Sequence, residues 1–370
     1  MSISAPRAFT SFRKKGADIK SIPGTRVSTH NAQLLTSTGL STLDFFIGGG
    51  LPVGTICLIE EDKHDIASKT IMKYFLSEAV IQNHKVFLSS GGRTTSEKLL
   101  KELPAAKTIE VKHQSNDKKF APDEVMKIAI QYQNQPPVQD AYLKVSYHNQ
   151  GFDLSKRMSE DLLHQCSLSV WDPTENCESE KIPYFLSNPY SQLLETIKSY
   201  IVTSGLKVPS KTCQTVMKIG ICSLGSPLWY KDDEKCQETQ ILRFLYLLKA
   251  LIRTSYAVAL ITIPFYLTQN KSLLSKIRQT CDMVISFESF EGTELADHPA
   301  FQEYAGLIHM TKLPVLNSCQ YPVKTTDLAY KTKRKEFIIE RLHLPPDFDD
   351  NSSETIAAGC GGPCSSKLDY

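Results

Sequence analysis

One short segment of the chain has residue types that could bind a nucleotide. Phosphate-binding P-loops follow the pattern G-x-x-x-x-G-K-[ST], in which glycines let backbone N–H groups wrap the phosphates, the lysine supplies charge and the hydroxyl holds Mg²⁺. At the corresponding place, residues 63–70 read KHDIASKT. Lys69 and Thr70 fill the last two positions of the pattern, so they are the candidate nucleotide-binding residues.

The glycines of that pattern are missing. Lys63 and Ser68 occupy their positions, and a residue with a Cβ atom is strained at the positive φ angles that a phosphate nest requires. Asp65 would also bring a carboxylate close to the polyphosphate. We therefore expect a degenerate P-loop that does not bind phosphate in the usual way. The alternative for Lys69 and Thr70 is that they are ordinary residues at the start of a helix.

P-loop enzymes also need a strand that ends in an aspartate, which holds Mg²⁺ through its water shell. The candidate strand runs from Val216 to Cys222 and continues as SLGSPLW, with no carboxylate before Asp232. The sequence therefore argues against an autonomous NTPase. An active ATPase with a divergent P-loop stays open as the alternative, with Lys69 on the phosphates and Thr70 on Mg²⁺.

Other patterns for chemistry are weak. Cys360 and Cys364 lie four apart in a glycine-rich tail, without a second pair or a nearby histidine to complete a zinc site. The nine histidines show no zinc-binding spacing, and no G-x-S-x-G elbow is present. We expect no metal, no cofactor and no catalytic residue.

Basic clusters are the candidates for binding nucleic acid. The clearest is Lys331, Lys333, Arg334 and Lys335; further positive charge lies in the Lys112 to Lys119 region and in the first 30 residues. Aromatic residues that could stack on bases are not interleaved with these runs. Each cluster is a candidate RNA contact, and the alternative is a solvated surface.

Composition places the chain among intracellular α/β proteins. Its 42 basic and 40 acidic residues give a net charge of +2, so any nucleic-acid surface must be local. Ten cysteines in a chain of 370 residues are expected to be reduced thiols, because a domain of this size needs no disulfide bonds. The most apolar segment, 254–268, is too short to span a membrane. We expect a protein of the cytoplasm and nucleus, without a membrane anchor.

Alternating apolar runs and helical periods predict the elements that position these residues. A β-branched strand at 55–59 leads into a helix over 65–83 and a second strand at 85–89, and Thr94 with Glu97 forms a capping box for the next helix. Such alternation is typical of a parallel sheet with crossover helices. The later elements are helices at 122–132, 191–202, 238–255 and 272–281 and strands at 216–222, 257–263, 283–287, 306–311 and 336–343, the last two antiparallel.

These elements predict one large domain with irregular ends. We expect a disordered basic arm over residues 1–30, an α/β domain over 31–345 and a flexible tail over 346–370. The polar, proline- and glutamine-rich stretch inside 104–190 is expected to be an insertion in the domain.

Several motifs carry a resemblance to known families. Residues 38–62 contain T-G-x-x-x-L-D and a Gly-Gly-Gly turn before an apolar strand, which resembles the opening of RecA-, RadA- and KaiC-type ATPase domains. Further motifs, in the same order along nearly the whole chain, are similar to the Elongator subunit four (PAXNEB) family. These are EED at 60–62, KYFLSEAV at 73–80, MKIAIQYQN at 126–134, FDLSKRM at 152–158, SLGSPLW at 223–229 and ERLHLPPD at 340–347.

The resemblance implies a fold, an assembly and a role. The fold is RecA-like, a twisted, mainly parallel sheet with helices on both faces. The family implies a ring of six with the fifth and sixth Elongator subunits, which joins the catalytic subcomplex, binds tRNA and supports wobble-uridine modification, while another subunit performs acetyl transfer.

Two points remain open within the resemblance. The family's ring responds to ATP, so ATP at a subunit interface stays open, and this chain departs from the family in keeping Lys69-Thr70. A pure scaffold without RNA affinity is a further alternative.

Overall fold

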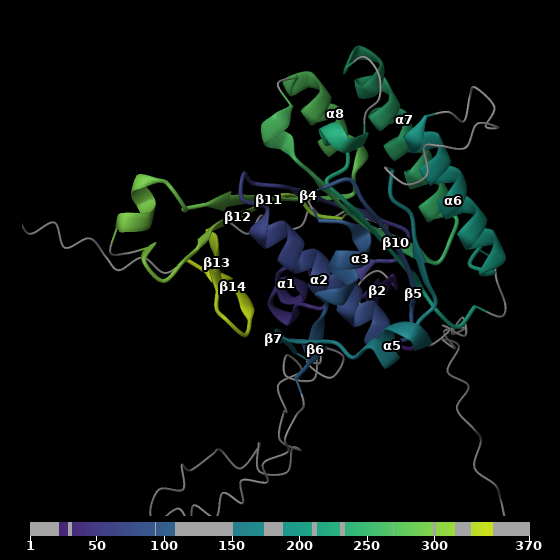
Figure 1. The fold of residues 1–370 in the computed structure, drawn as a ribbon, viewed down its shortest axis with the longest axis horizontal. Helices are drawn as coiled ribbons and strands as arrows, with labels where there is room; N and C mark the ends of the chain where they lie inside the picture. Colours follow the sequence, from purple (N-terminus) through teal and green to yellow (C-terminus); the bar gives the residue numbers. More distant parts are fainter. Residues whose placement is uncertain are drawn as a thin grey trace, which may run out of the picture.

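A nine-stranded mixed sheet forms the centre of the fold in the computed structural model (Figure 1). The structure describes residues 22–28, 32–92, 94–107, 151–173, 188–208, 213–229, 234–268, 270–298, 301–314 and 327–342. In spatial order the strands are β14 (Phe337–Arg341), β13 (Leu328–Thr332), β12 (Gly306–Lys312), β11 (Met283–Ser289), β4 (Ile56–Glu60), β10 (Ala257–Ile263), β9 (Met217–Cys222), β5 (Lys85–Ser90) and β8 (Leu168–Val170).

The sheet is parallel from β8 to β11 and antiparallel from β11 to β14. The parallel strands β5, β9, β10 and β4 follow each other in space, so their carboxyl ends form one edge, which we name the carboxyl edge. The strands predicted at 306–311 and 336–343, β12 and β14, lie in the antiparallel edge of the sheet, but β13, which was not predicted, lies between them. This five-residue strand was missed because its sequence, LAYKT, runs into the basic cluster and is too short for a clear period.

Each strand of the parallel part sends alternate side chains into two separate cores. In β4, Ile56 and Leu58 enter one core, while Cys57 and Ile59 enter the other, as the two-residue period of a strand requires. The core that contains Cys57 and Ile59 also takes α1 (Ser41–Phe46), α2 (Ile66–Ile81) and α3 (Ser96–Lys101). The core that contains Ile56 and Leu58 takes α6 (Pro189–Thr203), α7 (Glu234–Arg253) and α8 (Lys271–Thr280). Helices therefore cover both faces, and the predicted α/β class is confirmed.

Side-chain hydrogen bonds cap the N-termini of two helices, α6 and α8. The Asn188 side chain accepts the N–H of Tyr190 at the start of α6, and Asn270 accepts two N–H groups at the start of α8. The predicted capping box at Thr94 is wrong: α3 begins after Thr95, which makes no side-chain cap bond. The cap comes instead from a residue distant in sequence, as described below.

The T-G-x-x-x-L-D motif forms a buried network of hydrogen bonds around the Asp44 carboxylate. The Asp44 carboxylate accepts hydrogen bonds from the backbone N–H of Thr38 (2.9 Å), the Thr38 hydroxyl (2.7 Å) and the Ser37 hydroxyl (2.5 Å). Between them, Gly39 has φ +85°, and a Cβ there would lie 2.3 Å from the carbonyl oxygen of Tyr74. The glycine is required because the turn presses against the backbone of α2.

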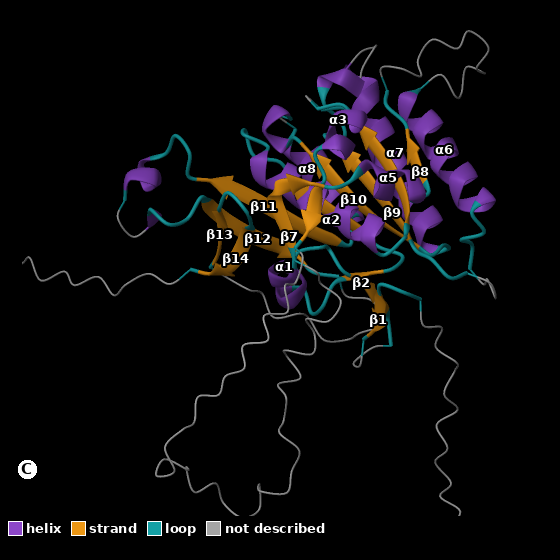
Figure 2. Cartoon of the chain, turned by 60° about the horizontal axis from the view of Figure 1, so that its bottom comes forward, coloured by secondary structure: helices purple, strands orange, loops and turns teal. Residues whose placement is uncertain are grey.

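Residues near the predicted domain boundaries are only partly described. Residues 22–28, assigned from sequence to the basic arm, contain β1 (Thr25–Val27), which pairs with β2 (Leu34–Thr36) in a small sheet completed by β3 (Leu51–Pro52), set apart from the main sheet (Figure 2). Within 104–190, the structure describes β6 (Pro104–Ala106), β7 (Phe152–Arg157), α5 (Glu160–Gln165) and β8. The predicted helix at 122–132 and the tail over 346–370 lie outside the described residues.

Candidate functional site

The loop from β4 to α2 stands where a P-loop would be. Such a loop would place phosphate at the N-terminus of α2, where backbone N–H groups and the helix dipole favour an anion. In this chain Asp65 is the N-cap of α2 and lies in the left-handed region, with φ 56°. A residue other than glycine in this conformation is uncommon, and here local hydrogen bonds hold it.

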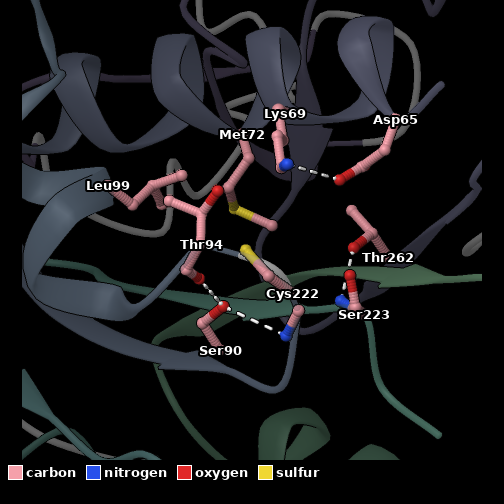
Figure 3. A pocket seen from close by; sticks show the side chains of 10 residues that line it. Asp65, Lys69, Met72, Ser90, Thr94, Leu99, Cys222, Ser223 and Thr262 are labelled. Carbon is pink, nitrogen blue, oxygen red and sulfur yellow. Dashed lines mark hydrogen bonds and ion pairs between the residues drawn. The ribbon is translucent and has the colours of Figure 1, made fainter. Parts of the chain in front are cut away.

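Two carboxylates of this loop engage the groups that a phosphate would use. The backbone N–H of Asp65 donates to Oδ1 of Asp62 at 2.8 Å. The Asp65 carboxylate accepts the hydroxyl of Ser68 at 2.5 Å and forms an ion pair with Lys69 at 2.9 Å (Figure 3). Lys69 therefore already has an anion of its own chain beside it.

The two predicted nucleotide-binding residues point to different places. Lys69 lines a small pocket at the carboxyl edge (Figure 3). The Thr70 hydroxyl donates back to the carbonyl of Ile66 at 2.7 Å, one turn earlier in α2, and Thr70 is not among the described residues that line the pocket. The structure therefore does not place Lys69 and Thr70 so that both could contact the same ligand.

A third carboxylate, Glu61, fills the space at the end of the neighbouring strands. Only 5% of Glu61 is exposed. Its Oε1 accepts the backbone N–H of Ser223 at 3.1 Å and the Ser223 hydroxyl at 2.9 Å, and it also accepts the hydroxyl of Thr262. Ser223 directly follows β9, the strand that would carry a Mg²⁺-binding aspartate. A carboxylate does reach this point, but it comes from the end of β4, which is separated from β9 by β10.

The environment of Glu61 favours its neutral form. Burial raises the pKa of Glu61 to about 7, and the charge of Asp65 acts in the same direction, against the hydrogen bonds from Thr262 and Ser223. Sequence analysis missed Glu61, although a Glu-Glu-Asp run directly after an apolar strand was visible. Its role depends on Ser223 and Thr262, which lie far away in the sequence.

The rest of the carboxyl edge is closed in the same manner. Asp172, just after β8, accepts the backbone N–H groups of Ser90 (2.8 Å) and Ser96 (3.1 Å) and the Ser96 hydroxyl, and so caps α3. Trp229, in the 3₁₀ turn η4 (Pro227–Trp229), donates its indole N–H to the carbonyl of Ser223 at 2.9 Å. Its ring packs against Gly91, where a Cβ would lie 1.9 Å from the indole nitrogen.

The pocket that remains is small. Its empty volume is about 260 Å³, part of which is open solvent, whereas ligand pockets usually measure about 300 to 1,000 Å³. It is lined by Asp65, Lys69, Met72, Ser90, Gly92, Thr94, Leu99, Cys222, Ser223 and Thr262 (Figure 3). Asp65 lines this space, and Glu61 accepts hydrogen bonds from Ser223 and Thr262, which also line it. Because these carboxylates would repel a polyphosphate, the pocket suits water better.

The predicted RNA-binding cluster lies on the hairpin of β13 and β14. Lys331 is paired with Glu303 (2.7 Å) and Glu340 (2.6 Å). Lys333, Arg334 and Lys335 are exposed at the hairpin tip. The structure thus separates Lys331, which is neutralised by its own chain, from the other three.

The remaining predicted sites have less structural detail. The Lys112 to Lys119 region and Cys360 with Cys364 lie outside the described residues. Within the described parts, His, Cys, Asp and Glu side chains form no group of three or more that could hold a metal ion. The helices of the described chain include none long and apolar enough to cross a membrane.

Fold and site together define a class: an α/β protein with a large mixed sheet between two layers of helices, whose carboxyl edge is occupied by its own carboxylates. The chain belongs to the PAXNEB protein family, which it matches over residues 18–370. It is similar to Elongator complex protein 4 of Mus musculus, with 40% identity covering 95% of this chain and 88% of the relative. Elongator complex protein 4 of Xenopus laevis is 39% identical (95% and 93% covered) and that of Homo sapiens 38% (96% and 90%).

Proposed function

We propose that this chain is a non-catalytic subunit of an Elongator complex, built on a RecA-like domain with a degenerate P-loop. The closed carboxyl edge carries the proposal. In a chain related along nearly its whole length to Elongator complex protein 4, Asp65 and Glu61 engage the groups that would otherwise face phosphate and Mg²⁺. The RecA-like frame is supported by the order of β4, its loop and α2 and by the parallel pairing of β4 with β10 and β11.

The subunit is proposed to act within a ring of six, together with the fifth and sixth Elongator subunits. Apolar side chains along the carboxyl edge support a protein contact there: Ile66, Leu228 and Leu267 are 52%, 52% and 49% exposed. They follow β4, β9 and β10, in α2, η4 and the 3₁₀ turn η5 (Phe265–Leu267). The ring would join the catalytic subcomplex, in the cytoplasm and nucleus.

Its proposed biochemical role is to hold tRNA for modification of the wobble uridine, with acetyl transfer performed by another subunit. The basic side chains at the β13–β14 tip support an RNA contact, because they are exposed and form no ion pair with a described residue. No residue of this chain is assigned to catalysis.

The test is to co-express the chain with the fifth and sixth subunits, measure the mass by light scattering and titrate tRNA at two salt concentrations. A six-membered assembly whose tRNA affinity falls with salt is the expected result, because counterion release accompanies phosphate contacts. A stable homo-oligomer that ignores those subunits and hydrolyses ATP alone would contradict the proposal. A ring without tRNA affinity would indicate a pure scaffold.

A further inference from the structure

Two segments far apart in the sequence form one basic surface. The tip of the β13–β14 hairpin lies beside β7, as both views show (Figures 1 and 2). Five exposed basic side chains gather there, and we name them the hairpin surface: Lys156, Arg157, Lys333, Arg334 and Lys335. Lys156 and Arg157 were not singled out from the sequence, because only the fold brings them next to the other three.

Backbone contacts hold the hairpin surface together. The N–H of Leu154 in β7 donates to the carbonyl of Lys335 at 2.9 Å, and the N–H of Lys333 donates to the carbonyl of Glu336 at 2.9 Å across the hairpin tip. Lys107 adds an ion pair with Glu336 at 2.8 Å. Because these contacts use the main chain of the hairpin tip, its basic side chains are not needed to build the surface.

The positive charge of the surface is available to a ligand. None of the five side chains forms an ion pair with another described residue, in contrast to Lys331 on the same hairpin. Three carboxylates lie close to them, and each is engaged. Asp153 accepts two hydrogen bonds from Ser155, Glu336 pairs with Lys107, and Glu102, near Arg157, pairs with Lys73. The Ser155 hydrogen bonds hold the pKa of Asp153 below its ordinary value, and Lys156 and Lys335 contribute in the same direction.

We propose that the hairpin surface binds the phosphate backbone of an RNA; the choice of RNA rests on the proposed function. The aromatic side chains of the three strands, Phe152, Tyr330 and Phe337, are buried, so the surface offers charge without a stacking platform. Such a surface contacts phosphates, not bases, and binds with strong salt dependence and little sequence preference.

The test uses the full-length chain co-expressed with the fifth and sixth subunits, with tRNA as the probe. One variant combines Lys333→Gln, Arg334→Gln and Lys335→Gln, and a second combines Lys156→Gln and Arg157→Gln. The matched control, Lys198→Gln with Lys271→Gln and Lys276→Gln, also removes three positive charges, from the exposed sides of α6 and α8. Thermal unfolding checks that each variant folds.

Both hairpin variants should bind tRNA more weakly, and the slope of log affinity against log salt should fall by about 0.7 to 0.9 for each phosphate that the variant no longer neutralises. The control should keep the slope of the unmodified chain. If the unmodified chain binds tRNA and both hairpin variants keep its affinity and slope, the hairpin surface is not the RNA-binding site. The proposed function would remain intact. No tRNA binding by the unmodified assembly would overturn the RNA role itself. Equal competition by duplex DNA would overturn the choice of RNA.

Discussion

At the scale of single residues, the carboxyl edge is governed by where carboxylates are buried. Glu61 is enclosed by Ser223 and Thr262, with the charge of Asp65 nearby, whereas Asp65 has Lys69 as a counterion. Burial without a cation favours the protonated form of an acid, so the environment of Glu61 favours its neutral form.

Glu61 should make the stability of the protein depend on pH. Its folded pKa of about 7 lies above the ordinary 4.5, so its contribution is complete below about pH 4.5 and is lost as the pH rises through about 7. At about 1.4 kcal/mol per pKa unit, this difference is worth about 3 kcal/mol. Glu61→Gln, which imitates the protonated acid, should be more stable than the unmodified chain at pH 8 by about 1 to 3 kcal/mol and equal to it near pH 4.5.

Urea unfolding from pH 5 to 8 measures this effect. The quantity to follow is the difference between variant and unmodified chain, because burial lowers the pKa of His84 to about 4, and that histidine titrates in part of the same range with the opposite sign. Glu195→Gln, on the exposed side of α6, is the control and should show no such pH-dependent difference. A constant difference for Glu61→Gln across the range would contradict the assignment.

Substitution of Lys69 distinguishes a non-catalytic subunit from an ATPase with a divergent P-loop. Lys69→Ala removes a partly exposed ion pair with Asp65, so it should cost about 0.5 to 1 kcal/mol of stability. It should change neither nucleotide binding nor ATP turnover by the purified assembly. Thr70→Ala, which removes only a hydrogen bond within α2, is the control. Loss of ATP turnover in Lys69→Ala alone would establish the ATPase.

At the scale of elements, a buried lysine joins three of them. Lys218 in β9 is fully buried and donates to the carbonyls of Ser37 (2.8 Å) and Phe75 (3.4 Å). Burial lowers its pKa to about 8, while the carboxylates of Glu78 in α2 and Asp44 in α1 act in the opposite direction. The lysine thus balances two acids that the core has taken out of water.

Removal of that lysine should be strongly destabilising. Lys218→Met leaves Glu78 and Asp44 without a cation, and the expected loss is about 3 to 5 kcal/mol of unfolding free energy. Adding Glu78→Gln should restore part of it, because one uncompensated acid is then removed. Urea denaturation of the single and double variants measures both. If the double variant were as unstable as Lys218→Met, charge balance would not be the cause.

The two turns that flank α1 offer a matched pair of glycines, Gly39 before the helix and Gly48 after it. Gly39 and Gly48 both have positive φ, 85° and 81°, but a Cβ at Gly39 meets the Tyr74 carbonyl at 2.3 Å, and one at Gly48 meets nothing within 4 Å. Gly48→Ala should cost about 1 kcal/mol for the backbone conformation alone. Gly39→Ala should cost at least about 1 to 3 kcal/mol more, because α2 must move. Equal losses of melting temperature would show that the turn relaxes freely.

At the scale of the whole molecule, the carboxyl edge combines internal polar closure with exposed apolar side chains. A closed edge has no need of a small ligand, and its apolar residues remain available to another protein. Leu228→Ser together with Leu267→Ser should weaken association with the fifth and sixth subunits about tenfold or more. Stability of the isolated chain should change little, since both leucines are about half exposed.

Sedimentation of the mixed subunits measures that effect. Val202→Ser is the control, because Val202 is 48% exposed on α6, away from the carboxyl edge. Association that survives the double substitution would place the interface elsewhere on the molecule.

The sequence by itself determined many of the elements, because hydrophobic periodicity acts locally. Helix and strand positions such as 216–222 and 257–263 agree with β9 and β10 within one residue, and the missing glycines of residues 63–70 predict a degenerate P-loop. The sequence also showed a lysine at 218 inside an apolar strand, although not its partners.

Only the tertiary structure decided which groups meet. Glu61 reaches Ser223 and Thr262 across 162 and 201 residues, and Asp172 caps α3 from 76 residues away. Lys331 was grouped with its sequence neighbours, yet strand pairing places it between Glu303 and Glu340, while Lys156 and Arg157 join the hairpin tip instead. Such contacts depend on the order of the strands in the sheet, which no local pattern encodes.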